Sequence, residues 1–409
     1  MPEHEVVIVG AGLAGLSAGI EVIERGHIPF LLEAADAVGG RVRTDEVDGF
    51  LLDRGFQILL TAYPEARRLL DYEALDLTAF APGAMVHLGD ALHAVGDPFR
   101  RPADLFATAR APIGSLLDKA RILDLRRRVR GCPVEELFLR PDITARARLE
   151  QLGFSPTIIE RFFRPLFAGI TLDRDLAGSS RQLEFVFRML ADGEAAVPAA
   201  GMGRISEQLA ARLPPDSIRL ATTVTEISAD RVATADGESI SAGTVILATD
   251  VTTAARLADV DDPGWNGVTS VWFSAPEPPT DSTAILLDGD GRGPAVDVAV
   301  MSNISPRYAP PGRALVVASA LSFGDDVTEQ VQAQLRGWFG AMVDGWDVLR
   351  TDRIPRAQPR STPGYDPAPP VRLPSGVFIA GDHRHDASIN GALASGRRTA
   401  RGAVSALTR

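Results

Sequence analysis

Two residue types are almost missing from this sequence, which has one cysteine, Cys132, and one lysine, Lys119, among 409 residues. A single cysteine excludes an internal disulfide framework and argues against a cysteine-ligated metal site, so we expect no bound metal. A chain without disulfides suits a reducing compartment, and we expect a cytoplasmic location. A secretory signal begins with basic residues, whereas Glu3 and Glu5 are acidic, so we do not expect the first residues to form such a signal. No apolar run reaches the roughly 18 residues of a membrane-spanning helix.

Positive charge is also in short supply, with 42 Lys and Arg against 53 Asp and Glu, a formal net charge of −11. Binding to phosphate backbones needs a basic surface, so nucleic acid is not an expected partner. Residues 100–130 are the exception, because they hold eight arginines and Lys119 against three aspartates. Leu116, Leu117 and Leu123 lie among these charges. The segment is expected to be either a solvated basic helix or a face that touches an anionic membrane peripherally.

A glycine-rich turn follows the first apolar run of the chain. Residues 6–9 are short, apolar and β-branched, which is typical of a buried parallel strand. Gly10, Gly12 and Gly15 then fit the pattern G-x-G-x-x-G. Gly10 permits a tight turn, Gly12 lets a pyrophosphate approach the backbone, and Gly15 lets a helix pack closely on the strand. The helix N-terminus would offer free N–H groups to the phosphates.

The residues after this turn complete a dinucleotide-binding unit. Leu13, Leu16 and Ile20 recur at helical spacing, and Gly26 suits the end of the helix. Residues 27–32 are expected to form a second strand, and Glu33 follows it. An acid at this position accepts hydrogen bonds from the adenosine ribose and disfavours a 2′-phosphate, so NAD or FAD is favoured over NADP.

Two further stretches favour FAD. Residues 39–41 are Gly-Gly-Arg, a second close-approach turn with a guanidinium that can bridge phosphate oxygens. Near the C-terminus, a strand at 377–380 ends in Gly381 and Asp382, and an acid there can bind a polyol such as ribityl. Ser388 precedes a helix rich in small residues, which would let the helix approach a flat ring and point its N-terminus at the flavin.

These stretches, together with residues 245–249, resemble the superfamily of flavin-containing amine oxidases, protoporphyrinogen oxidases and phytoene desaturases. The resemblance covers most of the chain. It implies an α/β fold with a Rossmann-like FAD-binding domain of the glutathione reductase type 2 family, an α+β substrate domain made of a sheet and a helical insertion, and non-covalent FAD in an oxidoreductase. The cofactor-binding residues expected from the motifs and the resemblance are Gly10, Gly12, Leu13, Ala14, Gly15, Glu33, Ala34, Gly40, Arg41, Gly55, Phe56, Gln57, Val224, Gly381, Asp382, Ser388 and Ile389.

The resemblance also implies a discontinuous domain organisation. Residues 1–80, 198–252 and 371–409 are expected to form the FAD domain, and residues 81–197 and 253–370 the substrate domain, with 100–197 mainly helical. Local patterns add a hairpin turning at 89–90, one strand over 218–224, a helix start at Ser155-Pro156, and a helix that opens at Asp326 with a capping box to Glu329. Val327, Val331, Leu335 and Trp338 would form the buried face of that last helix.

The substrate side departs from the amine oxidases of this superfamily, which usually have a lysine near flavin N5 and an aromatic cage before the last helix. Lys119 lies in the helical insertion, and no Tyr or Trp occurs between Gly381 and Gly396. The segment 152–190 resembles the phytoene desaturase and hydroxysqualene dehydroxylase branch instead. Six phenylalanines are expected either to line a tunnel for a small hydrophobic, isoprenoid substrate or to be ordinary core residues: Phe154, Phe162, Phe163, Phe167, Phe185 and Phe187.

Several alternatives stay open at this point. An amine oxidase is the second enzyme hypothesis, and a prenyl-lipid-binding carrier with the same fold is the hypothesis from another class. No catalytic residue is assigned. His383, His385 and Asp386 are candidates for a general base near the flavin, or for anchors of the loop that carries them. The electron acceptor and the oligomeric state are left undetermined.

Overall fold

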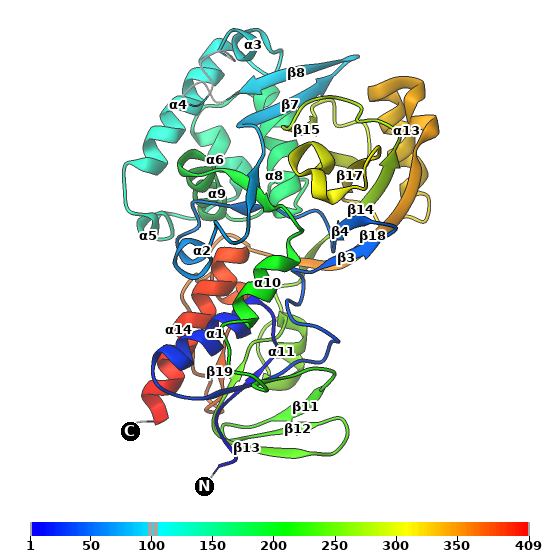
Figure 1. Ribbon diagram of the computed structural model, residues 1–409. Helices are drawn as coiled ribbons and strands as arrows, with labels where there is room; N and C mark the ends of the chain where they lie inside the picture. Colours follow the sequence, from blue (N-terminus) through cyan, green and yellow to red (C-terminus); the bar gives the residue numbers. More distant parts are fainter. Residues whose placement is uncertain (1, 97–99, 101–104, 408–409) are drawn as a thin grey trace.

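The computed structural model describes residues 2–96, 100 and 105–407, which form two large sheets and a set of helices (Figure 1). The first sheet runs in the order β10 (Ile218–Arg219), β2 (Pro29–Leu32), β1 (His4–Val9), β13 (Ser239–Leu247), β12 (Arg231–Thr234) and β11 (Val224–Ile227), and β19 (Phe378–Ile379) also pairs with β13. Strands β10, β2, β1, β13 and β19 are parallel to their neighbours, while β12 and β11 extend the sheet in antiparallel fashion. Segments from the beginning, middle and end of the chain therefore share one sheet.

The expected single strand over 218–224 is wrong. Strand β10 ends at Arg219, and β11 begins only at Val224 on the opposite side of the sheet. Between them Ala221 has a φ of +51°, a left-handed conformation that no strand accommodates. Thr222 and Ala221 donate hydrogen bonds from their backbone N–H groups to the carbonyls of Glu33 and Ala35, so the connecting turn runs past the end of β2.

The second sheet has the order β18 (Asp347–Pro359), β14 (Trp265–Ala275), β17 (Ala314–Ala320), β16 (Ala295–Val300), β15 (Ile285–Asp288), β7 (Gly83–Leu88) and β8 (Ala91–Gly96). The hairpin of β7 and β8 turns at residues 89–90, as expected. Helix α13 (Val327–Phe339) covers one face with Val327, Val331 and Leu335 fully buried. Its predicted capping box is wrong, because no side chain caps the helix at Asp326 and the Asp326 carboxylate accepts from Gln330 instead.

Helices fill the region between residues 105 and 192: α3 (Leu105–Arg110), α4 (Leu116–Arg130), α5 (Val134–Leu137), α6 (Ala145–Gln151), α7 (Pro156–Ile158), α8 (Arg164–Thr171) and α9 (Ser180–Asp192). Ser155 caps α7 through its hydroxyl, with Pro156 in the first turn, as predicted. A π-helical turn, Ile159–Phe163, joins α7 to α8. Pro165 lies just after it and lacks an N–H group, which explains why regular α-helical bonding is interrupted there.

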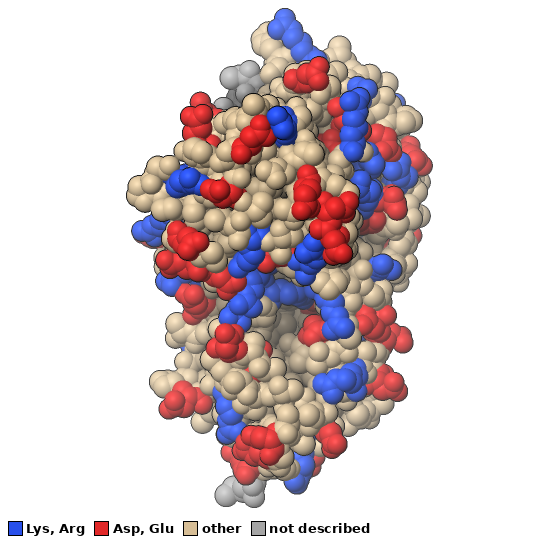
Figure 2. All heavy atoms as spheres, turned by 90° about the vertical axis from the view of Figure 1, so that its right-hand side faces the viewer, with Lys and Arg blue, Asp and Glu red and all other residues tan. Residues whose placement is uncertain are grey.

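Two small sheets lie between these parts in the chain. Strands β3 (Thr44–Val47) and β4 (Phe50–Asp53) form a hairpin, and β9 (Ala195–Pro198) lies between β5 (Leu59–Leu60) and β6 (Leu77–Ala79). The first sheet and both termini lie at one end of the molecule, and the second sheet and helices α3–α9 lie at the other (Figure 1). Seen from the side, basic side chains surround a hollow at mid-height between the two ends (Figure 2). No helix among the described residues has both the length and the apolar character to cross a membrane.

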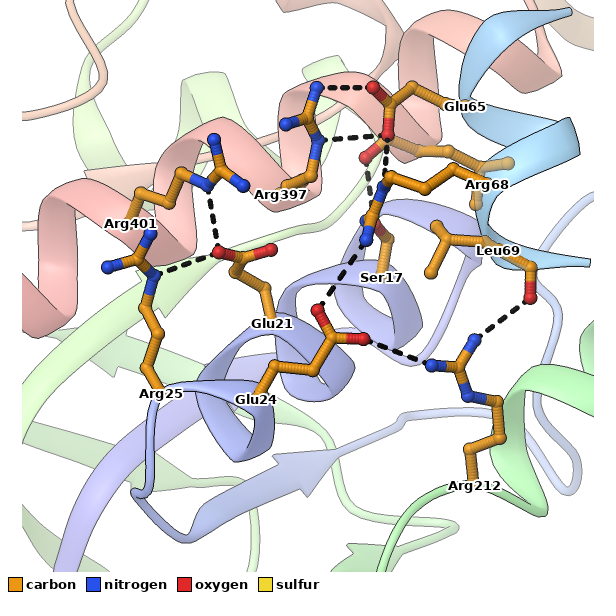
Figure 3. Close-up of polar contacts among 11 residues, drawn as sticks. Ser17, Glu21, Glu24, Arg25, Glu65, Arg68, Leu69, Arg212, Arg397 and Arg401 are labelled. Carbon is orange, nitrogen blue, oxygen red and sulfur yellow. Dashed lines mark hydrogen bonds and ion pairs between the residues drawn. The ribbon is translucent and has the colours of Figure 1, made fainter.

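Helices α1 (Leu13–Glu24) and α14 (Ile389–Leu407) lie side by side against the first sheet (Figure 1). Their contact is tight, because a Cβ added at Gly396 would lie 2.1 Å from the Ala14 carbonyl oxygen. An ion pair between the helices reinforces it, because Glu21 of α1 accepts from Arg401 of α14 at 2.8 Å (Figure 3). Glu21 also accepts from Arg25 at the end of α1, at 2.8 Å. Burial alone would raise the pKa of Glu21, but these two guanidinium groups hold it below its ordinary value. The helix that begins beside the C-terminal loop is thereby fixed to the helix that follows the glycine-rich turn.

Candidate functional site

One cavity of about 1090 Å³ runs from the first sheet into the helices. At one end it is lined by the glycine-rich turn, the ends of β2 and β11, and the residues before α14. At the other end it is lined by α4, α8, α9 and the second sheet. Of the seventeen residues expected to bind the cofactor, the cavity wall contains all but Gly15. The structure thus brings together segments that lie up to 379 residues apart in the sequence, from Gly10 to Ile389.

The three glycines of the turn have different surroundings. A Cβ at Gly12 would meet no atom within 4 Å, so the space above it opens into the cavity. A Cβ at Gly15 would lie 2.0 Å from the Gly10 carbonyl oxygen, which shows that this glycine serves the packing of α1 on the turn. Gly10 adopts a φ of +102°, a backbone conformation that favours glycine. This arrangement fits a ligand whose phosphates lie against the backbone at the start of α1.

Glu33 lies at the end of β2 and lines the cavity. Its carboxylate oxygens accept hydrogen bonds from the backbone N–H groups of Ala11, at 2.7 Å, and Ala35, at 2.9 Å. The Gly39 N–H donates to the Ala11 carbonyl at 2.9 Å, so the Gly-Gly-Arg turn is fastened to the glycine-rich turn. A carboxylate has about four acceptor positions, which leaves Glu33 able to accept from ribose hydroxyls as well.

Arg41 and Asp382 form an ion pair in the cavity wall. Arg41 Nη2 lies 2.8 Å from Asp382 Oδ2, and Arg41 Nη1 donates to the Ala357 carbonyl at 2.8 Å. The guanidinium carbon also lies 5.4 Å from the centre of the Trp265 ring. Asp382 is 6% exposed, so Arg41 is the cation that compensates a nearly buried carboxylate. The sequence predicted that both residues face one ligand, and the structure places them in direct contact beside the cavity.

The segment from Gly55 to Gln57 lines the cavity. Gly55 has a φ of +85°, and its Cβ would lie 2.8 Å from Ile354 of β18. Ser270 of β14 accepts the Phe56 N–H at 3.2 Å, and Gln57 Nε2 donates to the carbonyls of Arg41 and Arg54. These contacts fix the segment against the second sheet and against the turn that carries Arg41.

The loop before α14 is held by Asp386, which is fully buried. Its carboxylate accepts from Ser388 Oγ and from Asn390 Nδ2, and it lies 2.7 Å from His385 Nδ1. Neither His383 nor His385 is among the residues that line the cavity. Burial lowers the pKa of His383 to about 4, so its ring is neutral at ordinary pH. The contacts of Asp386 favour the interpretation that His383, His385 and Asp386 anchor the loop over the interpretation that one of them is a general base.

The small residues of α14 contribute less to the cavity than expected. Ile389 and Ala392 line it, but Gly391 and Gly396 do not. A Cβ at Gly391 would lie 1.7 Å from the Asp386 carbonyl oxygen, whereas Gly396 contacts α1. These glycines therefore permit close packing of α14 on the protein itself.

The phenylalanine tunnel is only partly present. Phe162 and Phe187 line the cavity, together with Leu166, Ile170 and Val186. The other four phenylalanines are core residues that are at most 4% exposed: Phe154, Phe163, Phe167 and Phe185. Helical spacing alone does not distinguish a lining position from a core position, because both lie on the inner face of a helix. Lys119 also reaches the cavity wall, where its ammonium group donates to the carbonyls of Ala109 and Ala111 and burial lowers its pKa.

Sequence reasoning missed several residues of the cofactor end. Arg54, Arg256 and Arg356 line the cavity in addition to Arg41, and Asp250 does so at the start of α11 (Val251–Ala258). Tyr63, just before α2 (Pro64–Leu69), lines it too. Arg54 directly precedes the predicted segment 55–57 and could have been found from that neighbour. Arg256 and Arg356 come from unrelated elements, and no local motif marks them.

Comparison with known proteins agrees with a dinucleotide-binding site in this cavity. The family described as flavin containing amine oxidoreductase matches residues 13–404. Curated relatives include a 15-cis-phytoene desaturase from an Oncidium hybrid cultivar, 46% identical over 66 residues. An L-amino-acid oxidase from Bungarus fasciatus is 48% identical over 71 residues. These matches cover 16% and 17% of this chain, and the chain spans only 11% and 13% of the length of these two relatives.

Solved structures resemble the whole chain. An oxidoreductase from Methanosarcina mazei aligns with a TM-score of 0.74 at 18% identity, over 99% of this chain and 100% of that one. Putrescine oxidase bound to putrescine aligns with a TM-score of 0.72 at 18% identity, over 98% of this chain and 99% of that one. At such identities the likeness shows the fold, an α/β architecture with a Rossmann-like domain.

The family match extends over nearly all of the chain, and the site residues expected from the sequence surround one cavity. The predicted family resemblance is confirmed, and the description of this family agrees with the predicted flavin cofactor and with the predicted oxidoreductase class. This chain belongs to the flavin containing amine oxidoreductase family.

Proposed function

We propose that this protein oxidises a hydrophobic substrate with FAD bound along the cavity. The observation that carries the proposal is the continuity of the cavity, whose one end is lined by a dinucleotide-binding turn and whose other end is lined by apolar side chains of α8 and α9. FAD held by these residues would supply a ring system able to take up a hydride equivalent from the substrate. The protein supplies binding, orientation and the exclusion of water.

The residues of the cofactor end divide by the part of FAD that they suit. The backbone from Gly10 to Ala14 suits the diphosphate, and Arg41 adds a guanidinium beside it. Glu33, Ala34 and Val224 suit the adenosine. Asp382, Ser388 and Ile389, with the segment 55–57, suit the ribityl and flavin end. In this proposal the residues 1–80, 198–252 and 371–409 form the FAD domain, and the remainder forms the substrate domain.

The substrate end suits an apolar molecule. Phe162, Leu166, Ile170 and Phe187 face the cavity from the helices, and Leu287 faces it from the second sheet. Such walls exclude water from the reacting atoms and bind through apolar contact. The short similarity to 15-cis-phytoene desaturases supports an isoprenoid as the substrate class.

Anaerobic titration tests this substrate class. Purified protein with its FAD is mixed under nitrogen with an isoprenoid precursor, such as squalene or phytoene, or with primary and secondary amines. Bleaching of the oxidised flavin absorption by the isoprenoid alone supports the proposal. Bleaching by amines alone identifies an amine oxidase, a function that the family also favours. A protein that binds isoprenoid but takes up no FAD would be the carrier.

The second part of the proposal is a peripheral membrane contact through α3 and α4. Leu116 and Leu123 both line the cavity and are 71% and 43% exposed, so the cavity reaches the surface between them. Phe106 and Leu117 are 75% and 59% exposed nearby in the chain. Arginines of the same segment would face anionic headgroups. Residues 101–104, which belong to the basic segment recognised in the sequence, lie outside the described residues.

A further inference from the structure

Asp297 is an acid in the apolar end of the cavity. It lies near the middle of β16, between β15 and β17, and both β16 and β15 contact α8. The side chain lines the cavity and is only 4% exposed. Its neighbours Leu287, Ile285 and Ile170 in the cavity wall are apolar. A carboxyl group in such a place is costly unless something compensates it.

Little compensation comes from the described part of the chain. Asp297 Oδ1 is buried without a hydrogen-bond partner there, and no described cation contributes to the pKa of this group. Burial raises the pKa of Asp297 to about 7, opposed only by a hydrogen bond from Ser319. By contrast, the nearly buried Asp382 at the cofactor end has Arg41 at 2.8 Å. When the carboxyl group is ionised, the partner that Oδ1 lacks is a hydrogen-bond donor.

The fold places Asp297 in a polar row that leads toward the cofactor end. Asp297 pairs with Ser319 of β17, and Ser319 pairs with Ser270 of β14, so the three side chains share one face of the sheet. Ser270 in turn accepts the Phe56 N–H. Adjacent strands are about 4.8 Å apart, so Asp297 lies about 10 Å across the sheet from β14, whose Ser270 contacts the loop residue Phe56.

The helix that faces β16 makes room for this carboxyl group. A Cβ at Gly169 of α8 would lie 2.0 Å from Asp297 Oδ2. Glycine within a helix is less favourable than alanine, so this position gives up helix stability where the carboxyl group needs space. Gly169 itself lines the cavity.

We propose that Asp297 anchors the substrate by accepting a hydrogen bond from a hydroxyl or protonated amino group that the otherwise apolar molecule carries. The inference rests on the proposed function and narrows its substrate class, because a plain hydrocarbon would leave the carboxyl group without a partner. A hydroxyl group donates to the carboxylate, and an ammonium group adds an ion pair to the same contact.

Binding of matched ligands tests the anchor without turnover. Dissociation constants of 1-octanol, octylamine and octane are measured by isothermal titration calorimetry on the FAD-loaded wild type, Asp297→Leu and Asp297→Asn. We expect the wild type to bind 1-octanol or octylamine at least about tenfold more tightly than octane. Asp297→Leu, of similar size, should abolish that preference and leave octane binding unchanged. Asp297→Asn should keep a preference for the alcohol only, which separates the two donor classes.

Controls separate the anchor from the fold and from the proposed function. Asp288→Asn removes another acid, 4% exposed and next to this strand, that does not line the cavity, and it should preserve the preference. If Asp297→Leu does not fold, Gly169→Ala displaces the carboxyl group and should weaken the polar ligands alone. A preference that survives in both Asp297→Leu and Gly169→Ala overturns the anchor. Failure of all three ligands to bind the wild type contradicts the hydrophobic substrate instead.

Discussion

Arg41 and Asp382 meet across 341 positions of the sequence, with Arg41 Nη2 2.8 Å from Asp382 Oδ2. Arg41 follows the Gly-Gly turn, and Asp382 follows the last strand of the first sheet. Their contact joins the two ends of the chain at the wall of the cavity. Arg41 both compensates a buried acid and faces the ligand site. Its loss should therefore affect the stability of the fold as well as the binding of the ligand.

Removal of this guanidinium should therefore affect both properties. Arg41→Met leaves Asp382 buried without its cation and takes a phosphate-binding group from the cavity. We expect FAD to bind about tenfold more weakly or worse, with a lower melting temperature of the apoprotein. Arg43→Met is the control, because Arg43 pairs with the exposed Asp36 and does not line the cavity. FAD titration by fluorescence measures the effect, and equal affinities of the two variants would contradict it.

The glycines of the turn should separate stability from cofactor binding. Gly15→Ala would place a Cβ 2.0 Å from the Gly10 carbonyl oxygen, so the apoprotein should lose several kcal/mol of unfolding free energy. Gly12→Ala meets no protein atom within 4 Å and has a permitted φ of −73°. Its apoprotein should be as stable as the wild type, while FAD affinity falls. Urea unfolding of both apoproteins measures the contrast, and a stable Gly15→Ala would refute the packing role.

Asp297 should make stability depend on pH. Its pKa is about 7 in the folded protein and near 4 in the unfolded chain, so the folded state retains the proton between these values. The stabilisation is complete below about pH 4 and is lost as the pH rises through 7, by at most about 4 kcal/mol. Asp297→Asn should therefore gain stability relative to the wild type between pH 5 and pH 8, on the order of 2 kcal/mol or more. Urea unfolding at several pH values measures the difference, and a difference independent of pH would be inconsistent with a buried, unpaired carboxyl group.

The exposed apolar residues of α3 and α4 should bind membranes. We expect the protein to sediment with vesicles rich in phosphatidylserine, and less so as salt is raised. The double variant Phe106→Asp and Leu117→Asp should bind far less. Leu139→Asp tests the place of the contact, because Leu139 is 79% exposed but lies after α5. Equal sedimentation of both variants and the wild type would exclude this face.

The residues at the cofactor end of the cavity could be predicted from the sequence, because they belong to local motifs. A turn that needs Gly12, and acids at strand ends such as Glu33 and Asp382, follow from backbone geometry and charge, and all three line the cavity. The same locality explains the errors. The chain from 218 to 224 looks like one strand by composition, and only tertiary contacts turn it at Ala221. Asp297 was not recognised, because an acid within a strand is ordinary until the sheet and α8 bury it without a partner.

The central claim, that this cavity holds one FAD, is tested most directly by the absorption spectrum of the purified protein before and after denaturation. Our account predicts oxidised flavin bands at one flavin per chain, with the flavin released by denaturation and identified as FAD by mass spectrometry. A folded protein that is colourless and shows no spectral or calorimetric change on incubation with FAD would contradict the account.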